Sequence, residues 1–241
     1  MSLNFFSKII RRSFKGKIYL TFDDGPILGT RNSYQICKEI GVKSTFFMVG
    51  IHANNRRSKL LLKEVNECYP MLLIGNHSFS HAKLKYNDFY NNPTNAFYDF
   101  VKAESILSLR VPIARLPGSN SWILDDQRKY SSMVSELCNR LDKRGYNIIG
   151  WDFEWSNNNY KEDHNMRYLK IVEDIYMQFF SSRLFTDKNI VILLHDWMFT
   201  DEQNIIQLKK LIIYLKEDGL LQFETIENYP GLKKTLEFCD E

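Results

Sequence analysis

Residues 17–26 read KIYLTFDDGP, and this stretch decides the class of fold. It opens with a largely apolar run rich in β-formers, which is typical of a buried strand. Asp23 and Asp24 follow the run directly, and Gly25-Pro26 supplies a turn signal. Adjacent carboxylates repel each other when close, so the pair indicates a functional strand end; a capped turn is the alternative interpretation.

Similar apolar runs alternate with helical patterns along the rest of the chain. The expected strands are 17–22, 44–49, 71–75, 113–116, 147–151, 190–194 and 221–226. The expected helices are 31–41, 57–68, 95–110, 128–144, 166–181 and 203–217. Gly41, Gly145 and Gly219 follow three of these helices, where a terminating glycine is expected. The pattern predicts a parallel α/β protein, either a barrel or a doubly wound sheet.

Ionisable residues follow five of the expected strands. They belong to the segments Asp23-Asp24, Asn76–His81, Arg115–Asn120, Asp152–Trp155 and His195–Trp197. The carboxyl ends of parallel strands lie at one face of the sheet, and active sites form there. We therefore expect these segments to converge in space.

His77 and His81 are separated by four residues, a spacing at which two imidazoles on one turn can bind one ion. Two solvated loop histidines are the alternative interpretation. A carboxylate from a neighbouring strand favours the metal site, and Asp23 and Asp24 supply two candidates. One Asp with two His leaves positions open for water and substrate, which is typical of a catalytic site.

Composition and charge exclude several classes of protein. The 241 residues are 44% hydrophobic and 25% charged, as in globular domains, and no apolar stretch is long enough to span a membrane. The net charge of +3 arises at the start of the chain: residues 1–17 carry five basic residues and no acid, leaving 27 basic and 29 acidic residues in the remainder. A near-neutral body argues against nucleic-acid binding.

Four of the motifs resemble those of the NodB-homology polysaccharide deacetylases, carbohydrate esterase family four. They are Thr21-Phe22-Asp23-Asp24-Gly25-Pro26, His77-Ser78-Phe79-Ser80-His81, Arg115-Leu116-Pro117-Gly118-Ser119 and Leu193-Leu194-His195, in the family's order. The resemblance implies a deformed (β/α) barrel of about seven parallel strands, of the NodB-homology type. This domain would span residues 17–241, after a basic arm at residues 1–16.

The resemblance also implies roles for the motif residues. Asp23 would be the general base, Arg115 would bind it and hold it ionised, and His195 would be the general acid for the departing amine. The metal ligands would be Asp24, His77 and His81, for a divalent ion that is usually zinc, with cobalt, manganese or nickel as alternatives. Substrate contacts are expected from Pro117, Gly118, Trp155, Trp197 and Leu193.

The fourth motif departs from the family's pattern, which has an Asp-Trp pair after this strand. Residues 151–155 read WDFEW, so Glu154-Trp155 is the best counterpart and Asp152 is the competing carboxylate for support of His195. Packing inside the barrel is an equal alternative for Trp151 and Trp155. Elsewhere, His52 follows the strand 44–49 and is interpreted as a loop histidine rather than a sugar contact.

These features predict a metal-dependent enzyme that removes an N-acetyl group from an N-acetylated sugar in a polysaccharide, glycan or lipid-linked sugar. Hydrolysis of another C–N or O-acetyl bond is the enzymatic alternative, and a catalytically silent carbohydrate-binding protein is the non-enzymatic one. The loops expected to select the sugar, 25–32, 82–95 and 156–165, carry no readable code.

The first residues predict location rather than chemistry. Residues 1–17 lack the charge order and cleavage site of a secretory signal, so we expect a cytoplasmic protein. Their basic residues, with Phe5, Phe6, Ile9 and Ile10, would suit peripheral contact with an anionic membrane; a solvated arm is the alternative. The sequence assigns no oligomeric state.

Overall fold

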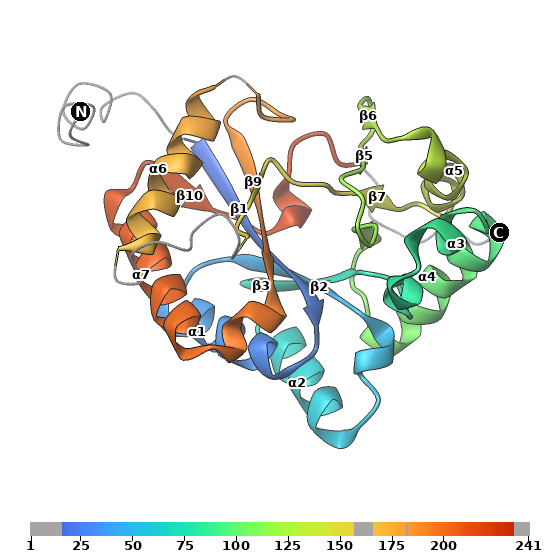
Figure 1. Cartoon of the computed structure of the whole chain (residues 1–241), viewed down its shortest axis with the longest axis horizontal. Coiled ribbons are helices and arrows are strands. Elements are labelled where there is room, and N and C mark those ends of the chain that lie inside the picture. The colour runs from blue at the N-terminus through green and yellow to red at the C-terminus, as the bar shows by residue number, and fades with distance from the viewer. Residues whose placement is uncertain (1–15, 157–165, 182, 234–241) are drawn as a thin grey trace.

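The computed structural model describes residues 16–156, 166–181 and 183–233, in which helices surround one curled, mostly parallel sheet (Figure 1). The sheet order is β6-β5-β7-β4-β3-β2-β1-β9-β8, and β10 also pairs with β1. The strands are β1 (Gly16–Gly25), β2 (Ser44–Met48), β3 (Leu72–Asn76), β4 (Ile113–Ala114), β5 (Trp122–Ile123), β6 (Arg128–Lys129), β7 (Asn147–Ile148), β8 (Phe153–Glu154), β9 (Asn189–His195) and β10 (Leu221–Phe223). The predicted fold class is confirmed.

All seven apolar runs expected from the sequence contain strands, and each of these seven strands pairs in parallel with a neighbour. Three further strands, β5, β6 and β8, were not expected. Each has two residues, which is too short for an alternation pattern to predict. β5 and β6 form an antiparallel pair at one edge of the sheet.

β1 lies inside the sheet and carries the TFDDG motif. It pairs with β9 along its length, with β10 beside its first residues and with β2 beside its last. Because side chains alternate along a strand, β1 presents two sets. One set packs in the core beneath the helices: Ile18, Leu20 and Phe22. The other set faces the interior of the curl, where Tyr19 contributes to an apolar floor and Asp23 stands at the open end.

Residues 147–155 reach both sides of the curl without forming a continuous strand. β7 pairs with β4 at one end of this segment, and β8 pairs with β9 at the other. Between them, the Ile149 N–H donates to the Ala114 carbonyl and the Asp152 N–H donates to the Val191 carbonyl, both at 2.9 Å. The sheet is therefore a half-barrel whose open side is spanned by a single segment.

Helices cover the outer side of the sheet (Figure 1). They are α1 (Leu28–Ile40), α2 (Arg56–Glu67), α3 (Tyr86–Tyr90), α4 (Pro93–Leu107), α5 (Ser135–Lys143), α6 (Arg167–Phe180) and α7 (Glu202–Asp218). Six match expected helices, α3 was not expected, and α5 starts later than predicted because β6 and a 3-10 turn precede it. Gly41, Gly145 and Gly219 all have positive φ, as expected of residues that end a helix.

Part of the predicted organisation lies outside the described residues. Residues 1–15 and 157–165 are not among them, so the basic arm, its membrane contact and most of the loop 156–165 stay predictions. Within the described part of the chain, no helix is long and apolar enough to cross a membrane.

The start of α1 packs against the turn η6 (Asp196–Thr200) that follows β9. The buried Asp196 carboxylate accepts hydrogen bonds from Thr30 Oγ1 at 2.6 Å and from Ser33 Oγ at 2.7 Å. A Cβ atom added at Gly29 would lie 1.7 Å from the Asp196 carbonyl oxygen. The helix therefore approaches the turn more closely than any side chain at position 29 permits.

Gly29→Ala is expected to lower the free energy of unfolding by about 3 kcal/mol, because the clashing atom is main chain and cannot swing aside. Urea unfolding measures the loss. Gly219→Ala is the matched control: its φ is +69° but no neighbouring atom lies closer than 4.0 Å, so the expected cost is about 1 kcal/mol. Equal losses in the two variants would contradict the close approach of α1 to η6.

Candidate active site and metal centre

The five strand ends that the sequence singles out converge on one cavity of about 400 Å³. Its lining comes from β1, the loop after β3, the loop after β4, the segment 151–154 and the end of β9. The residues that line it are Asp23, Asp24, His77, His81, Leu84, Tyr86, Leu116, Gly118, Trp151, Glu154, Leu193, His195 and Trp197. Charged, imidazole and aromatic groups are thereby gathered in one cavity.

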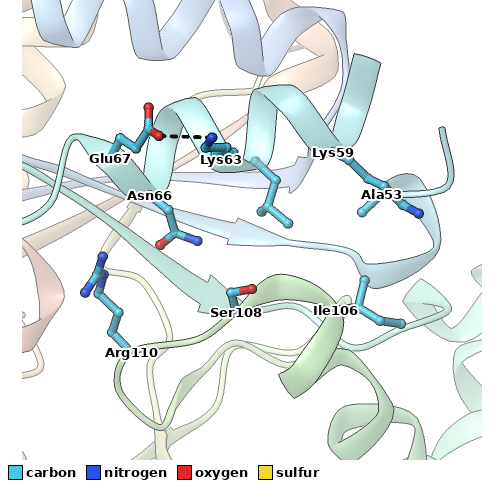
Figure 2. A pocket seen from close by; sticks show the side chains of 9 residues that line it. Ala53, Lys59, Lys63, Asn66, Glu67, Ile106, Ser108 and Arg110 are labelled. Carbon is cyan, nitrogen blue, oxygen red and sulfur yellow. Dashed lines mark ion pairs between the residues drawn. The ribbon is translucent and has the colours of Figure 1, made fainter. Parts of the chain in front are cut away.

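A larger cavity of about 730 Å³ lies elsewhere, between α2 and the C-terminal end of α4 (Figure 2). Lys59, Lys63 and Arg110 contribute charge, and the one acidic residue in its lining, Glu67, is paired with Lys63 at 3.6 Å. Among the residues that the structure describes, no histidine and no pair of carboxylates line this cavity. It therefore lacks the groups that hydrolysis requires.

A β-bulge explains how two adjacent carboxylates reach the same cavity. Asp23 pairs with Phe47 and Gly25 with Met48, so Asp24 is an extra residue on β1. Its φ is +78°, in the left-handed region. In a regular strand neighbouring side chains point to opposite faces. The bulge turns Asp24 back toward the cavity that Asp23 faces.

Asp24, His77 and His81 form a cluster suited to a divalent metal ion. One ligand atom from each lies within 4.8 Å of the others. Asp24 Oδ1 lies 3.2 Å from His81 Nε2 and 3.7 Å from His77 Nε2. This oxygen is buried, yet within the described residues it forms no hydrogen bond. Burial raises the pKa of Asp24, because desolvation disfavours the charged carboxylate. A bound cation would stabilise that charged form.

The two imidazoles are prepared to act as ligands. His77 Nδ1 lies 2.8 Å from the Arg115 carbonyl, which can only accept, so Nδ1 carries the proton. Its Nε2 lone pair then faces Asp24. Burial lowers the pKa of both His77 and His81, because desolvation disfavours the charged ring. Both rings are therefore neutral at pH 7, the form that binds metals.

Asp99 on α4 holds the loop that carries the two histidines. Its Oδ2 accepts hydrogen bonds from the N–H groups of Phe79 and Ser80, at 3.0 and 2.9 Å. Ser78 Oγ accepts from the His81 N–H at 3.0 Å. The loop includes positive φ angles at Ser78 and His81, so these bonds fix a backbone that is unfavourable by itself.

Asp23 forms a buried ion pair with Arg115. Arg115 Nη1 lies 2.9 Å from Asp23 Oδ1, and both side chains are almost entirely removed from solvent. The guanidinium also donates to Thr21 Oγ1 and to the carbonyls of Ile149 and Gly150. Because Oδ1 is bound to Arg115, Oδ2 is the oxygen left facing the cluster, 3.6 Å from His77 Nε2.

His195 ends β9 directly beside Asp23, its register partner on β1. Its ring is tilted against Trp197, with centroids 5.9 Å apart, and Trp197 is half-exposed at the cavity rim. The cavity thus has a carboxylate and an imidazole on neighbouring strands beside the cluster of three ligands. That arrangement can place a base and an acid on either side of a bound amide.

The structure separates the two carboxylates of the fourth motif. Asp152 lies outside the cavity and accepts hydrogen bonds from the N–H groups of Phe185 at 2.7 Å and Val191 at 2.8 Å. Burial raises the pKa of Asp152 to about 6. Glu154 lines the cavity instead. No hydrogen bond joins either of these described carboxylates to His195, and position alone favours Glu154 as its neighbour.

Two residues expected to contact substrate lie behind the cavity wall. Trp155 is fully buried and packs edge-on against Phe199, with ring centroids 5.7 Å apart. Trp151 takes the place in the lining that Trp155 was expected to fill. Pro117 is buried and its carbonyl accepts from the Tyr90 hydroxyl, whereas Gly118 lines the cavity. Leu193 and Trp197 line it as expected.

The polysaccharide deacetylase family model matches residues 11–114, which include Asp23 and the cluster of Asp24, His77 and His81. This stretch is a polysaccharide deacetylase domain as that family model describes it, and curated relatives of the chain are deacetylases as well. The resemblance inferred from the four motifs is therefore confirmed. Arg115, Glu154 and His195 lie beyond the matched stretch, and the fold brings them to it.

The curated relatives have low sequence identity to this chain, but they match most of its length. The chain is 22% identical to a chitin disaccharide deacetylase of Vibrio alginolyticus, over 89% of this chain and 71% of the relative. It is 28% identical to a peptidoglycan-N-acetylglucosamine deacetylase of Bacillus cereus, over 86% of this chain and 69% of the relative.

Solved structures of deacetylases share the fold. The polysaccharide deacetylase Bc1974 from Bacillus cereus superposes with a TM-score of 0.67 at 21% identity, covering 91% of this chain and 97% of that one. The catalytic domain of a peptidoglycan N-acetylglucosamine deacetylase from Eubacterium rectale gives a TM-score of 0.68 at 21% identity, with 94% and 96% covered. At this identity the likeness establishes the half-barrel architecture.

Several supports of the deacetylase site were missed from the sequence. Tyr86 lines the cavity from the unexpected α3, and Asp99 and Asp196 hold the loops behind the site. The signal in the sequence is a carboxylate among apolar residues, Asp99 in AFYDFV and Asp196 in LLHDWMF. Burial raises the pKa of Asp196 to about 8.

The raised pKa of Asp196 predicts a pH-dependent stability. The folded state binds this proton more tightly than the unfolded chain, so the stabilisation is complete below the unfolded pKa and is lost as pH rises toward about 8. Asp196→Asn mimics the protonated acid. Between pH 5 and pH 8, the wild type is expected to lose stability relative to Asp196→Asn in urea unfolding. The exposed control Asp125→Asn should follow the wild type; a constant difference for Asp196→Asn would contradict the raised pKa.

Proposed function

We propose that the protein is a divalent-metal-dependent carbohydrate N-deacetylase. It hydrolyses the acetamide of an N-acetylated sugar in a polysaccharide, glycan or lipid-linked sugar and releases acetate. The observation that carries this proposal is the meeting, in one cavity, of an unsatisfied Asp24 carboxylate with two neutral imidazoles, the Asp23–Arg115 pair and His195.

The donor set fits a resident metal ion. Asp24, His77 and His81 offer one oxygen and two nitrogens, which suits zinc and also cobalt, manganese or nickel. When bound, such an ion supplies Lewis-acid polarisation of the amide carbonyl and a water of lowered pKa. Three protein ligands leave positions open for both functions.

The side chains around the cluster supply the proton transfers. Arg115 binds Asp23 Oδ1 and so directs Oδ2 toward the cavity, where it accepts a proton from the attacking water. His195, on the neighbouring strand, donates a proton to the amine nitrogen as it leaves. Without that proton the amine is too poor a leaving group. The backbone of the third motif, of which Gly118 lines the cavity, would donate to the developing oxyanion.

The walls of the cavity suit a single sugar residue. Tyr86, Trp151 and Trp197 surround it with aromatic rings, and Leu193 adds an apolar surface for the acetyl methyl. Its volume of about 400 Å³ lies in the range of small-molecule sites. The names of the Vibrio alginolyticus and Bacillus cereus relatives support an N-acetylated sugar as substrate.

Hydrolysis of an O-acetyl ester is the second candidate. Structures of a family 4 carbohydrate esterase from Streptomyces lividans in complex with acetate and of an esterase from Streptococcus mutans share the fold, with TM-scores of 0.60 and 0.65. Both reactions release acetate, but only amide hydrolysis leaves a free amine. Mass spectrometry of the product sugar separates the two, and glycan binding without acetate release under saturating metal would contradict both.

Chelation is expected to abolish acetate release from N-acetylated oligosaccharides, and added zinc or cobalt to restore it, because the proposed ion polarises the amide carbonyl and lowers the pKa of the attacking water. The combined change His77→Ala and His81→Ala should abolish both activity and restoration. Chitooligosaccharide, peptidoglycan fragments and polyprenyl-linked N-acetylhexosamine form the substrate panel. Full activity of the double variant in the presence of chelator would remove the metal from the mechanism.

Glu154→Gln and Asp152→Asn separate the carboxylates of the fourth motif. Glu154→Gln is expected to lower kcat about 10²-fold, the lower end of what a positioned general acid contributes, while the protein stays folded. Asp152→Asn is expected to cost about 1–3 kcal/mol in urea unfolding through a lost backbone contact, with kcat little changed. The reverse pattern would assign the support of His195 to Asp152.

A further inference from the structure

The short turn η2 (Gly50–His52), which follows β2, lies between the two segments that carry the proposed metal ligands. On one side, the Val49 N–H just before it donates to the Gly25 carbonyl at 2.6 Å. On the other, the N–H groups of Gly50 and Ile51 donate to the carbonyls of Ser78 and Phe79, at 3.0 and 2.8 Å. The turn therefore ties the Asp24 bulge to the histidine loop.

The contact between η2 and the histidine loop depends on a glycine. A Cβ atom at Gly50 would lie 2.9 Å from the Phe79 ring and 3.2 Å from Phe79 Cα. The second of these neighbours is main chain and has little freedom to retreat. The separation of the two ligand-bearing segments is thus set by backbone in direct contact.

His52 is the side chain through which η2 reaches Asp24. Its Nδ1 lies 2.8 Å from the Asp24 carbonyl oxygen, and since a carbonyl can only accept, Nδ1–H is the donor. The bond acts on the residue whose φ is +78°, the extra residue of the bulge. His52 is half-buried and does not line the cavity.

We propose that His52 is a positioning residue for the metal centre. By binding the Asp24 carbonyl it holds the bulge in the conformation that directs the Asp24 carboxylate toward His77 and His81. It touches neither the reacting atoms nor the ligand atoms, and acts through the main chain of one ligand. The inference rests on the proposed metal-dependent function, because the ligand cluster is the part of that function it supports.

The test compares variants that keep or remove the donor. His52→Asn places an amide nitrogen near the position of Nδ1, whereas His52→Ala and His52→Phe have no donor, the second retaining a ring. Asn54→Ala, at an exposed neighbouring position, is the control. Co²⁺ binding to the metal-free full chain is measured by calorimetric titration, and the thermal unfolding of each metal-free variant is recorded alongside.

Removal of the donor is expected to weaken Co²⁺ binding about 10–100-fold, the loss that outer partners of metal ligands cause. His52→Asn and Asn54→Ala should bind nearly as the wild type does. If His52→Ala does not fold, the comparison of His52→Phe with His52→Asn gives the same answer.

Three results would overturn the role of His52. One is unchanged Co²⁺ affinity in a folded variant that lacks the donor. Another is a raised KM with unchanged affinity, which would make His52 a sugar contact. The third is a weakening that His52→Asn shares in full. Absence of Co²⁺ binding by the wild type would instead overturn the metal-dependent function itself, and this role with it.

Discussion

The buried guanidinium of Arg115 is the interaction on which the rest of the site depends. An unpaired charge in this position would be costly, and the structure surrounds it with acceptors from two parts of the chain. Asp23 and Thr21 come from β1, and the carbonyls of Ile149 and Gly150 come from the segment that spans the open side of the half-barrel. The main-chain carbonyl of the same residue orients His77. The side chain and the backbone of Arg115 thereby align Asp23, the proposed base, His77, a proposed metal ligand, and the spanning segment.

Arg115 also explains why the interior of the curl can be polar at one end. Along β1, the inward residues change from Tyr19 over an apolar floor, through Thr21, to Asp23 at the opening. The Phe47 ring lies 4.3 Å from the guanidinium carbon and forms the boundary between the two regions. The floor excludes water from below, so the charges above it interact in a medium of low dielectric. Electrostatic contacts there are stronger than they would be at the surface.

The sequence predicted the strands and strand ends well because both depend on local signals. Apolar runs of five or more residues report burial directly, and polar residues after them report the functional face of a parallel sheet. TFDDGP and HSFSH add a spacing that few other folds would produce. The positions of Asp23, Asp24, His77, His81 and His195 in one cavity follow from these signals, with Arg115 buried behind Asp23.

The segment WDFEW was not readable in the same way. Trp151 and Glu154 line the cavity, whereas Asp152 and Trp155 do not, and this spacing of three does not fit the alternation expected of a strand. The segment leaves β7, spans the open side and joins β9, so its side chains are directed by tertiary contacts. The bulge at Asp24 was hidden for a related reason: two adjacent acids show no sign of the extra residue that turns one of them.

The bulge has a consequence for how this protein would respond to selection. Asp24 occupies a left-handed conformation that a glycine would adopt at no steric cost, and its buried Oδ1 has no hydrogen-bond partner among the described residues. Both features oppose folding of the metal-free chain. Variants chosen for thermal robustness alone, in the absence of metal, would therefore tend to discard Asp24. Stability of the metal-free chain and the proposed metal binding therefore favour different residues at position 24. A library of variants selected for stability would have to keep Asp24 unchanged.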